Sequence, residues 1–302
     1  MATLYTHADS NIRKTWFLLG FFFVFIIFLG WLFSYVFQSQ LVLIFAVAVS
    51  ILMSISSYWY SDKLVLAMTR ARRIEKSDAP ELYRIVENLS ITAGIPQPRI
   101  FIIDEEAPNA FATGRDSKHA VIAVTRGLLE RLERAELEGV IAHELSHIGN
   151  RDMLLSTVLV ILVGIIVLVS DIFLRSTFWG GMGRRDSRDR GQLAGILFAL
   201  ALVAAILAPI AATLLRLTIS RKREFLADSS GTLLTRYPEG LARALEKIAR
   251  DPHELRVASN ATAHLFFANP FKGEREASWF TKLFMTHPPV EERISALLNM
   301  AK

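Results

Sequence analysis

The sequence predicts a mainly α-helical membrane protein, in which four hydrophobic helices accompany a water-facing domain of helices and a small β-sheet. The 302 residues are 52% hydrophobic, with a mean hydropathy of +0.35, which is too apolar for an ordinary soluble globule. Four apolar stretches explain the excess, and each reaches about 20 residues, enough for a helix to cross a bilayer core. They are residues 15–37, 41–60, 153–174 and 193–217.

The first two stretches predict an N-terminal transmembrane hairpin over residues 1–60. Aromatic residues lie near their ends, where an interfacial belt is expected: Trp16, Trp31, Tyr35, Trp59 and Tyr60. Arg13 and Lys14 precede the hairpin, five basic residues follow it between 63 and 76, and the link at 38–40 is uncharged. By the positive-inside rule, both ends of the hairpin face the cytoplasm.

Residues 61–152 and 219–302 predict the two parts of the water-facing domain, with a second hydrophobic hairpin between them at 153–218. Residues 79–93 have apolar side chains at helical spacing, and Gly94 and Pro96 end that helix. The β-branched runs 100–104 and 120–125 predict strands. The run 128–142 is rich in good helix formers and continues into the motif below.

The chemistry of the chain is concentrated in the pentapeptide His143-Glu144-Leu145-Ser146-His147. On a helix, two histidines four residues apart lie one turn above each other and can hold a single Zn²⁺. Glu144 can then reach a metal-bound water as general base. The alternative is an ordinary exposed helix with two histidines, but apolar residues at 137, 140, 141 and 145 give this helix a buried face.

A catalytic zinc needs a third protein ligand. A third histidine six places after His147 is one solution, but Met153 stands there. The better candidate is Glu224, with Asp228 one turn later on the same face, where its carboxylate could fix the tautomer of a ligand histidine. The alternative is that residues 221–228 are only a solvated, charged helix end.

Membrane topology is consistent with Glu224 as the third ligand. His147 and Glu224 are 77 residues apart, and two hydrophobic stretches separate them, so two crossings return the chain to the same side. The charge of the link between those stretches argues against two full membrane crossings. Residues 175–190 contain five arginines and two aspartates, and full crossing would place this basic link outside the cytoplasm, against the positive-inside rule. A short or tilted hairpin would resolve this conflict.

Six features together resemble the integral-membrane gluzincin proteases, and most closely the HtpX-type heat-shock proteases of bacterial inner membranes. They are the N-terminal spans, residues 109–114, residues 142–152, two further apolar stretches, residues 220–228 and the segment Thr286-His287-Pro288-Pro289. The resemblance implies one Zn²⁺ per chain bound by His143, His147 and Glu224, with Glu144 as the catalytic base. It also implies a multi-pass location with the active site facing the cytoplasm, and action on peptide segments of misfolded membrane proteins, alongside other quality-control partners.

Two further segments have predicted roles in the active site. Asn109-Ala110-Phe111-Ala112 could form an edge strand that pairs with an extended substrate, or an ordinary hairpin loop; the resemblance favours the substrate role. His287 could stabilise the oxyanion or bind the metal reversibly, or could cap the helix that follows Pro288 and Pro289. His7, His119, His253 and His264 have no partner spacing and are expected at the surface.

Three competing functions fit the sequence less well. An intramembrane metalloprotease needs an apolar zinc helix, but six charged residues lie between 130 and 138. A prenyl-protein protease would have more than four spans. A membrane scaffold or transporter with a structural zinc site would have four protein ligands and no free base, unlike the motif with Glu144. The net charge is +5, and the basic residues lie beside the membrane segments without a nucleic-acid motif. They are therefore not interpreted as a nucleic-acid-binding surface.

Overall fold

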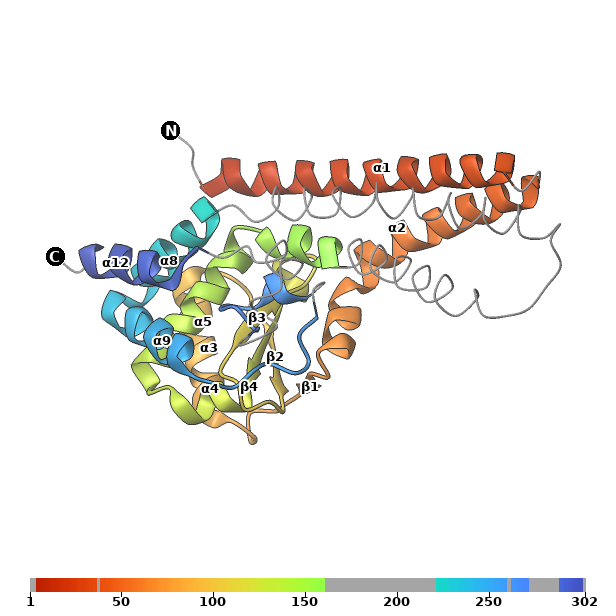
Figure 1. Ribbon diagram of the computed structural model, residues 1–302. Coiled ribbons are helices and arrows are strands. Elements are labelled where there is room, and N and C mark those ends of the chain that lie inside the picture. Colours follow the sequence, from red (N-terminus) through yellow and green to blue (C-terminus); the bar gives the residue numbers. More distant parts are fainter. Residues whose placement is uncertain (1–3, 37–38, 161–220, 260–261, 272–287, 301–302) are drawn as a thin grey trace.

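The computed structural model describes residues 4–36, 39–160, 221–259, 262–271 and 288–300. A long helical hairpin projects from a globular body (Figure 1). Its two helices are α1 (Leu4–Val36) and α2 (Gln40–Met68). Within the described residues, these two helices contain the segments that are long and apolar enough to cross a membrane, Asn11–Phe28 and Leu43–Tyr60.

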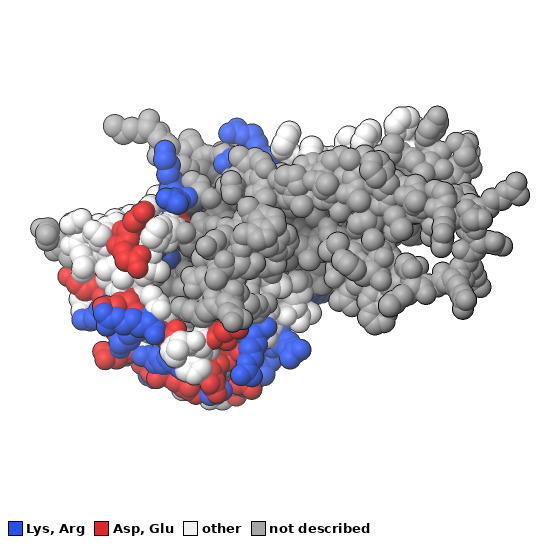
Figure 2. All heavy atoms as spheres, viewed as in Figure 1, with Lys and Arg blue, Asp and Glu red and all other residues white. Residues whose placement is uncertain are grey.

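The hairpin exposes most of its apolar surface. Only 28% and 11% of the two candidate spans are buried, whereas the core helix of a soluble protein is mostly buried. Trp16, Phe17 and Phe45 have exposed fractions of 59%, 71% and 71%. Charged side chains gather over the globular body instead, while the described atoms at the far end of the hairpin are uncharged (Figure 2). This distribution suits a hairpin surrounded by lipid.

Most of the third hydrophobic stretch and all of the fourth lie outside the described residues. Residues 152–160 are helical and mostly buried. The rest of the third stretch, the whole of the fourth and the basic link at 175–190 lie beyond the described part of the chain. The count of four hydrophobic helices and the hairpin at 153–218 therefore remain predictions.

The body contains a small mixed sheet in the order β1-β2-β4-β3. Its strands are β1 (Arg72–Arg73), β2 (Arg99–Ile103), β3 (Ala110–Thr113) and β4 (Val121–Thr125). β2 and β4 are parallel, while β3 runs antiparallel to β4 with Phe111 opposite Ala123. The two runs predicted as strands are thus β2 and β4, and the segment predicted as a possible edge strand is β3.

Helices pack around the sheet (Figure 1). They are α3 (Pro80–Ala93), α4 (Arg126–Arg131), α5 (Arg134–Gly149), α8 (Arg221–Thr235), α9 (Pro238–Arg250) and α12 (Val290–Met300). The helix-forming run 128–142 is divided between two of them. α4 ends before Leu132, and Glu133 starts α5 as an N-cap in a capping box with Glu136. This reciprocal cap satisfies the backbone N–H groups of a new helix start, which propensity alone does not reveal.

α5 is the central helix of the body and contacts α3, α8, α9 and β3. Two glycines allow its neighbours to approach closely. A Cβ at Gly139 would lie 2.9 Å from the Leu241 backbone of α9, and one at Gly231 of α8 would lie 2.9 Å from the backbone nitrogen of His143. Because the backbone of α8 at Gly231 approaches the backbone of His143 this closely, α8 packs directly against the pentapeptide.

Candidate metal centre

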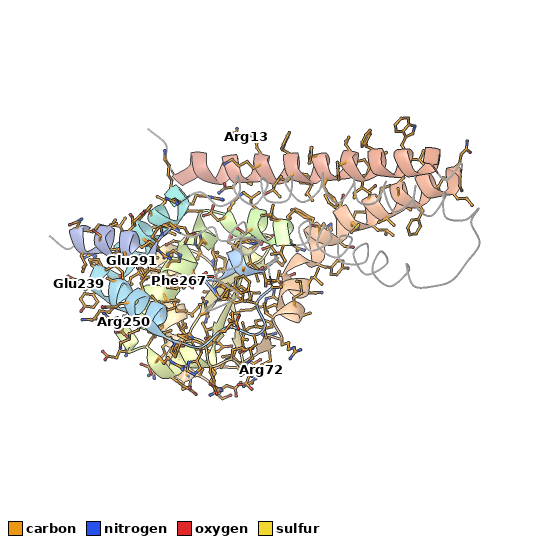
Figure 3. The ribbon with its side chains drawn as sticks, in the orientation of Figure 1. Arg13, Arg72, Glu239, Arg250, Phe267 and Glu291 are labelled. Atoms are coloured by element: carbon orange, nitrogen blue, oxygen red, sulfur yellow. The ribbon has the colours of Figure 1, made fainter. Side chains whose placement is uncertain are left out.

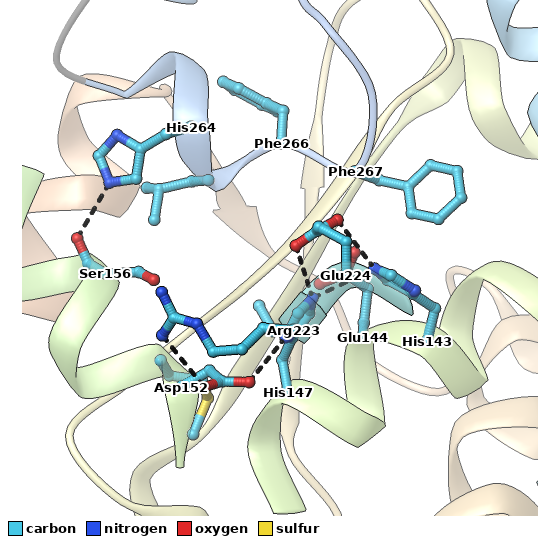
Figure 4. Close-up of a pocket in the computed structure, with 13 residues that line it drawn as sticks. His143, Glu144, His147, Asp152, Ser156, Arg223, Glu224, His264, Phe266 and Phe267 are labelled. Carbon is cyan, nitrogen blue, oxygen red and sulfur yellow. Dashed lines mark hydrogen bonds and ion pairs between the residues drawn. The ribbon is translucent and has the colours of Figure 1, made fainter. Parts of the chain in front are cut away.

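His143 and His147 lie one turn apart on α5 and turn toward the same point (Figure 4). Their Nε2 atoms are 3.1 Å apart. On the other side of each ring, a carboxylate faces Nδ1: Asp228 Oδ1 at 2.9 Å from His143, and Asp152 Oδ2 at 3.2 Å from His147. Each carboxylate accepts a hydrogen bond from Nδ1–H, so the proton stays on Nδ1 and the lone pair of each imidazole lies on Nε2.

Glu224 of α8 supplies the third group at this point. Its Oε1 lies 3.6 Å from His147 Nε2, and its Oε2 lies 3.8 Å from His143 Nε2. One atom from each of the three residues lies within 4.8 Å of the others. Two ligands bound to zinc at tetrahedral angles are about 3.4 Å apart, given bond lengths near 2.1 Å. The donor set and its spacing therefore fit a divalent zinc ion.

Asp228 is itself held by Arg293, which sequence reasoning did not identify. Arg293 of α12 has an exposed fraction of 1%. Its Nε and Nη2 bind the two oxygens of Asp228 at 2.9 and 2.7 Å, and its Nη1 donates to the Phe267 carbonyl at 3.1 Å. Arg293 Nη1 also lies 3.8 Å from Glu224 Oε2. The guanidinium thus fixes the Asp228 carboxylate behind His143 and places a positive charge near the Glu224 carboxylate.

Asp152, which lies behind His147, was also not predicted. The chain turns sharply between α5 and Asp152, with Arg151 in the left-handed region at φ 55°, and this brings Asp152 back to the histidine five residues earlier. Its other oxygen, Oδ1, accepts from Asn11 at 2.6 Å and from Arg223 at 3.3 Å. The outer partners of the two histidines thus differ: one is held by α12, and the other by α1 and α8.

Glu144 lies beside the three grouped residues with an exposed fraction of 2% and lines the same pocket. Burial raises the pKa of its carboxyl to about 7, and the negative charge of Glu224 acts in the same direction. His147, a backbone hydrogen bond from Ala112, and Arg293 act against this rise. A carboxyl with a pKa near neutral suits a group that accepts and returns a proton.

The imidazoles also have shifted pKa values. Burial lowers the pKa of His143 to about 4, so that ring is neutral, as a metal ligand must be. Burial acts to lower the pKa of His147 as well, but the hydrogen bond with Asp152 and the charge of Glu224 raise it to about 9. A cation bound by the site would displace the proton from His147.

Comparison with known proteins identifies the family. The sequence profile of Peptidase family M48 matches residues 76–301. The chain belongs to this family. A protease HtpX homolog of Thermoanaerobacter pseudethanolicus is 45% identical over 302 residues, covering 99% of this chain and 98% of the relative. One from Thermococcus sibiricus is 49% identical over 271 residues, covering 89% of this chain and 90% of the relative.

The protein is accordingly a membrane-associated M48 metalloprotease, and the resemblance to HtpX-type proteases is confirmed. A scaffold or transporter without enzymatic activity is no longer a competing interpretation. Among solved structures, that of S. mikatae Ste24p is 20% identical, with a TM-score of 0.44 over 97% of this chain and 67% of that chain.

The segment Asn109–Ala112, predicted to bind substrate, lies partly against the chain's own residues 267–268 and partly at the pocket. The Asn109 side chain pairs with the Ala268 backbone through contacts of 2.9 and 3.2 Å, and the Ala110 carbonyl accepts from Phe267 at 2.8 Å. The outer edge of β3 at these residues is thus occupied by the chain's own segment. Phe111 is fully buried against Phe266, whereas Ala112 lines the pocket beside Glu144.

The remaining histidines of the M48 chain differ from one another. His287 lies outside the described residues. His119 and His253 are exposed, with side-chain exposed fractions of 46% and 42%. The expectation of a surface position is wrong for His264, which is 5% exposed, has its Nε2 3.2 Å from the Ser156 carbonyl and lines the pocket. No spacing in the sequence links His264 to the pentapeptide, because the short helix η2 (Ala263–Leu265) brings it there.

Proposed function

We propose that this metalloprotease is a zinc-dependent endopeptidase that cleaves exposed segments of misfolded or damaged membrane proteins at the cytoplasmic face of a bacterial inner membrane. The observation that carries the zinc proposal is the convergence of His143, His147 and Glu224, with Glu144 buried beside them. The charge-free link of the first hairpin and the basic residues at both of its ends support the cytoplasmic orientation.

Each residue of the centre has a distinct role in the proposed reaction. His143, His147 and Glu224 would hold the zinc, and Asp228 and Asp152 keep the two Nε2 lone pairs directed at it. When bound, zinc supplies Lewis acidity toward the scissile carbonyl and lowers the pKa of water to about 7. Glu144 takes the proton of the attacking water and later delivers it to the leaving amine.

The Ala112 carbonyl, at the outer edge of β3, is the proposed site of substrate pairing, since the N–H of the same residue donates to Glu144. Alternate residues of a strand point their backbone groups to the same side. The Ala110 carbonyl points to the outer edge, where Phe267 binds it, so the backbone groups of Ala112 point there as well. An extended peptide added at this edge would run past Glu144. Asn109 and Ala110 then position the segment 267–268 rather than the substrate.

The decisive experiment compares wild type with Glu144→Gln, using casein and a model membrane protein as substrates and measuring the zinc content of each preparation. We expect the variant to keep zinc and lose turnover, because an amide cannot accept the proton of water. Ser146→Ala is the matched control, since the Ser146 hydroxyl donates to the Ala142 carbonyl of its own helix. Equal turnover by wild type and Glu144→Gln would contradict the proposed mechanism.

A second variant tests the metal set. Glu224→Ala removes a ligand from α8 while leaving the α5 histidines in place. Purified wild type should contain one zinc per chain, and Glu224→Ala should contain much less. Retention of wild-type zinc affinity by Glu224→Ala would remove Glu224 from the ligand set.

A further inference from the structure

The first membrane helix contributes a side chain to the hydrogen-bond network of the metal centre. Asn11 of α1 lies at the start of the candidate span Asn11–Phe28, yet it is 3% exposed. Its Nδ2 donates to Asp152 Oδ1 at 2.6 Å and to the Asn150 carbonyl at 3.3 Å. These partners are 141 and 139 residues away in the chain.

In both contacts the amide nitrogen of Asn11 is the hydrogen-bond donor. A carboxylate and a carbonyl only accept hydrogen bonds, and the two N–H groups of an Asn side chain match two such acceptors. Asn150 is the C-cap of α5, so its carbonyl belongs to the unsatisfied groups at a helix end. Asn11 therefore donates a hydrogen bond to a carbonyl at the C-terminal end of α5, the helix that carries His143 and His147.

The contact between Asn11 and Asp152 is the shorter of the two contacts that Asp152 Oδ1 makes across the fold. Arg223 Nη1 approaches the same oxygen at 3.3 Å, compared with 2.6 Å for Asn11. Oδ2 of the same carboxylate faces His147 Nδ1 at 3.2 Å. The orientation of the His147 ring thus depends on a carboxylate whose closest partner belongs to α1.

A continuous buried face holds α1 in this position. Asn11 and Thr15 are buried one turn apart, and Leu18, Leu19 and Phe22 continue the same face. These three apolar residues belong to a cluster with Leu154, Leu155, Val158 and Leu159, which follow Asp152 in the chain. Arg13 points away from the body (Figure 3). The membrane helix is therefore packed along the segment that carries Asp152.

We propose that Asn11 is a positioning residue for His147, acting through Asp152, so that the metal centre is complete only when the first membrane helix is docked. This inference rests on the proposed role of His147 as a zinc ligand. Removing an outer partner of a metal ligand commonly lowers metal affinity about 10–100-fold. Because Asn11 acts one contact further out, we expect about a 10-fold loss.

The test measures zinc affinity in the full-length protein in detergent, by competition with a chromogenic zinc chelator. Asn11→Leu keeps a similar volume and removes both donors, while Asn11→Asp places a second carboxylate against Asp152. Thr15→Val is the matched control: Thr15 is 1% exposed on the same face, and its hydroxyl donates to the Asn11 carbonyl of its own helix. We expect weaker zinc binding in both Asn11 variants, the larger loss in Asn11→Asp, and wild-type binding in Thr15→Val.

A double-mutant cycle separates positioning from general packing. Combining Asn11→Asp with Asp152→Asn restores a donor opposite an acceptor, so the pair should bind zinc more tightly than the two single effects predict. A general loss of α1 docking would give no such recovery. If Asn11→Leu fails to accumulate as a folded protein, Asn11→Ala, which also removes both donors, provides the same comparison.

Two outcomes would overturn the proposal: zinc affinity in the Asn11 variants equal to that of Thr15→Val, or strictly additive effects in the cycle. Glu224→Ala in the same assay distinguishes this failure from failure of the metal centre. If Glu224→Ala loses zinc while Asn11→Leu binds it normally, only the positioning role is wrong. If Glu224→Ala also binds zinc normally, the proposed ligand set is wrong.

Discussion

Arg293 and Asp228 form a two-pronged ion pair in the interior of the protein, although 65 residues separate them in the chain. Both are 1% exposed, and the distances are 2.9 Å for Nε to Oδ2 and 2.7 Å for Nη2 to Oδ1. The guanidinium also lies over the ring of Phe267, 4.8 Å from its centre. The C-terminal helix α12 thereby fixes the carboxylate that orients His143.

We expect Arg293→Met to destabilise the protein and to weaken zinc binding. Removing one partner of a buried pair leaves an uncompensated charge and costs about 3–5 kcal/mol. Loss of the fixed Asp228 carboxylate should lower zinc affinity about 10–100-fold. Arg293→Lys should recover only part of both losses, because an ammonium cannot bind both oxygens in the planar fork geometry. Thermal unfolding in detergent and chelator competition measure the two effects.

The control for this prediction is Arg250→Lys. Arg250 pairs with Glu246 at 2.6 Å on α9, but its side chain is 78% exposed, so water screens the pair. We expect wild-type stability and zinc affinity for Arg250→Lys. An Arg293→Lys variant that behaves like this surface control would show that the fork geometry has no role in the centre.

The sequence predicted the parts of the centre that depend on local spacing. The pentapeptide places His143, Glu144 and His147 by helix periodicity alone, and the i, i+4 relation of Glu224 and Asp228 does the same on α8. Arg293 left a local signal as well, since it shares the apolar face of its helix with Leu297. A charged residue on an apolar stripe indicates a buried ion pair, but its partner depends on long-range packing.

The roles of Asp152, Asn11 and His264 had no comparable local signal. Asp152 reaches His147 through a left-handed turn at Arg151, and an arginine gives no indication of such a turn. Asn11 and His264 reach the site only because α1 and the segment 262–268 fold against it. The break between α4 and α5 was missed for another reason, because the capping box at Glu133 and Glu136 uses residues that also favour a continuous helix.

Gly231 should be intolerant of a side chain. A Cβ there would lie 2.9 Å from the His143 nitrogen and 3.1 Å from the Ala142 carbonyl carbon, and both are backbone atoms that cannot rotate away. We expect Gly231→Ala to push α8 from α5 at a cost of about 1–3 kcal/mol, with weaker zinc binding because Glu224 moves with α8.

Gly149→Ala is the matched control for this glycine. It lies at the end of α5, and a Cβ there meets nothing within 4 Å among the described residues. Its Tm should equal or slightly exceed that of wild type, because alanine favours helix. A Gly231→Ala variant with the same Tm and zinc affinity as Gly149→Ala would show that the close approach of the two helices is not required.

The membrane orientation can be tested cleanly because the chain contains no cysteine. Ser77 is exposed on the body, and Gln40 is exposed at the start of α2 in the link of the hairpin. If the body faces the cytoplasm, a membrane-impermeant maleimide should label Gln40→Cys in intact spheroplasts and Ser77→Cys only after lysis. The reverse pattern would place the metal centre outside the cytoplasm.

Substrate pairing at the edge of β3 predicts that one amide of the peptide backbone matters more than the others. The Ala110 carbonyl is bound by Phe267 and the Ala112 N–H donates to Glu144, so the Ala112 carbonyl accepts from a single substrate amide. N-methylation of that amide removes the donor and leaves the buried Ala112 carbonyl without it, at a cost of about 1–3 kcal/mol. A peptide with one defined cleavage site, methylated at one amide at a time, should therefore show KM raised about 10-fold or more at one position. The neighbouring positions serve as internal controls, because the side chains and the peptide length are unchanged. Uniform sensitivity, or none, would mean that the substrate is held by its side chains and that Ala112 only lines the pocket beside Glu144.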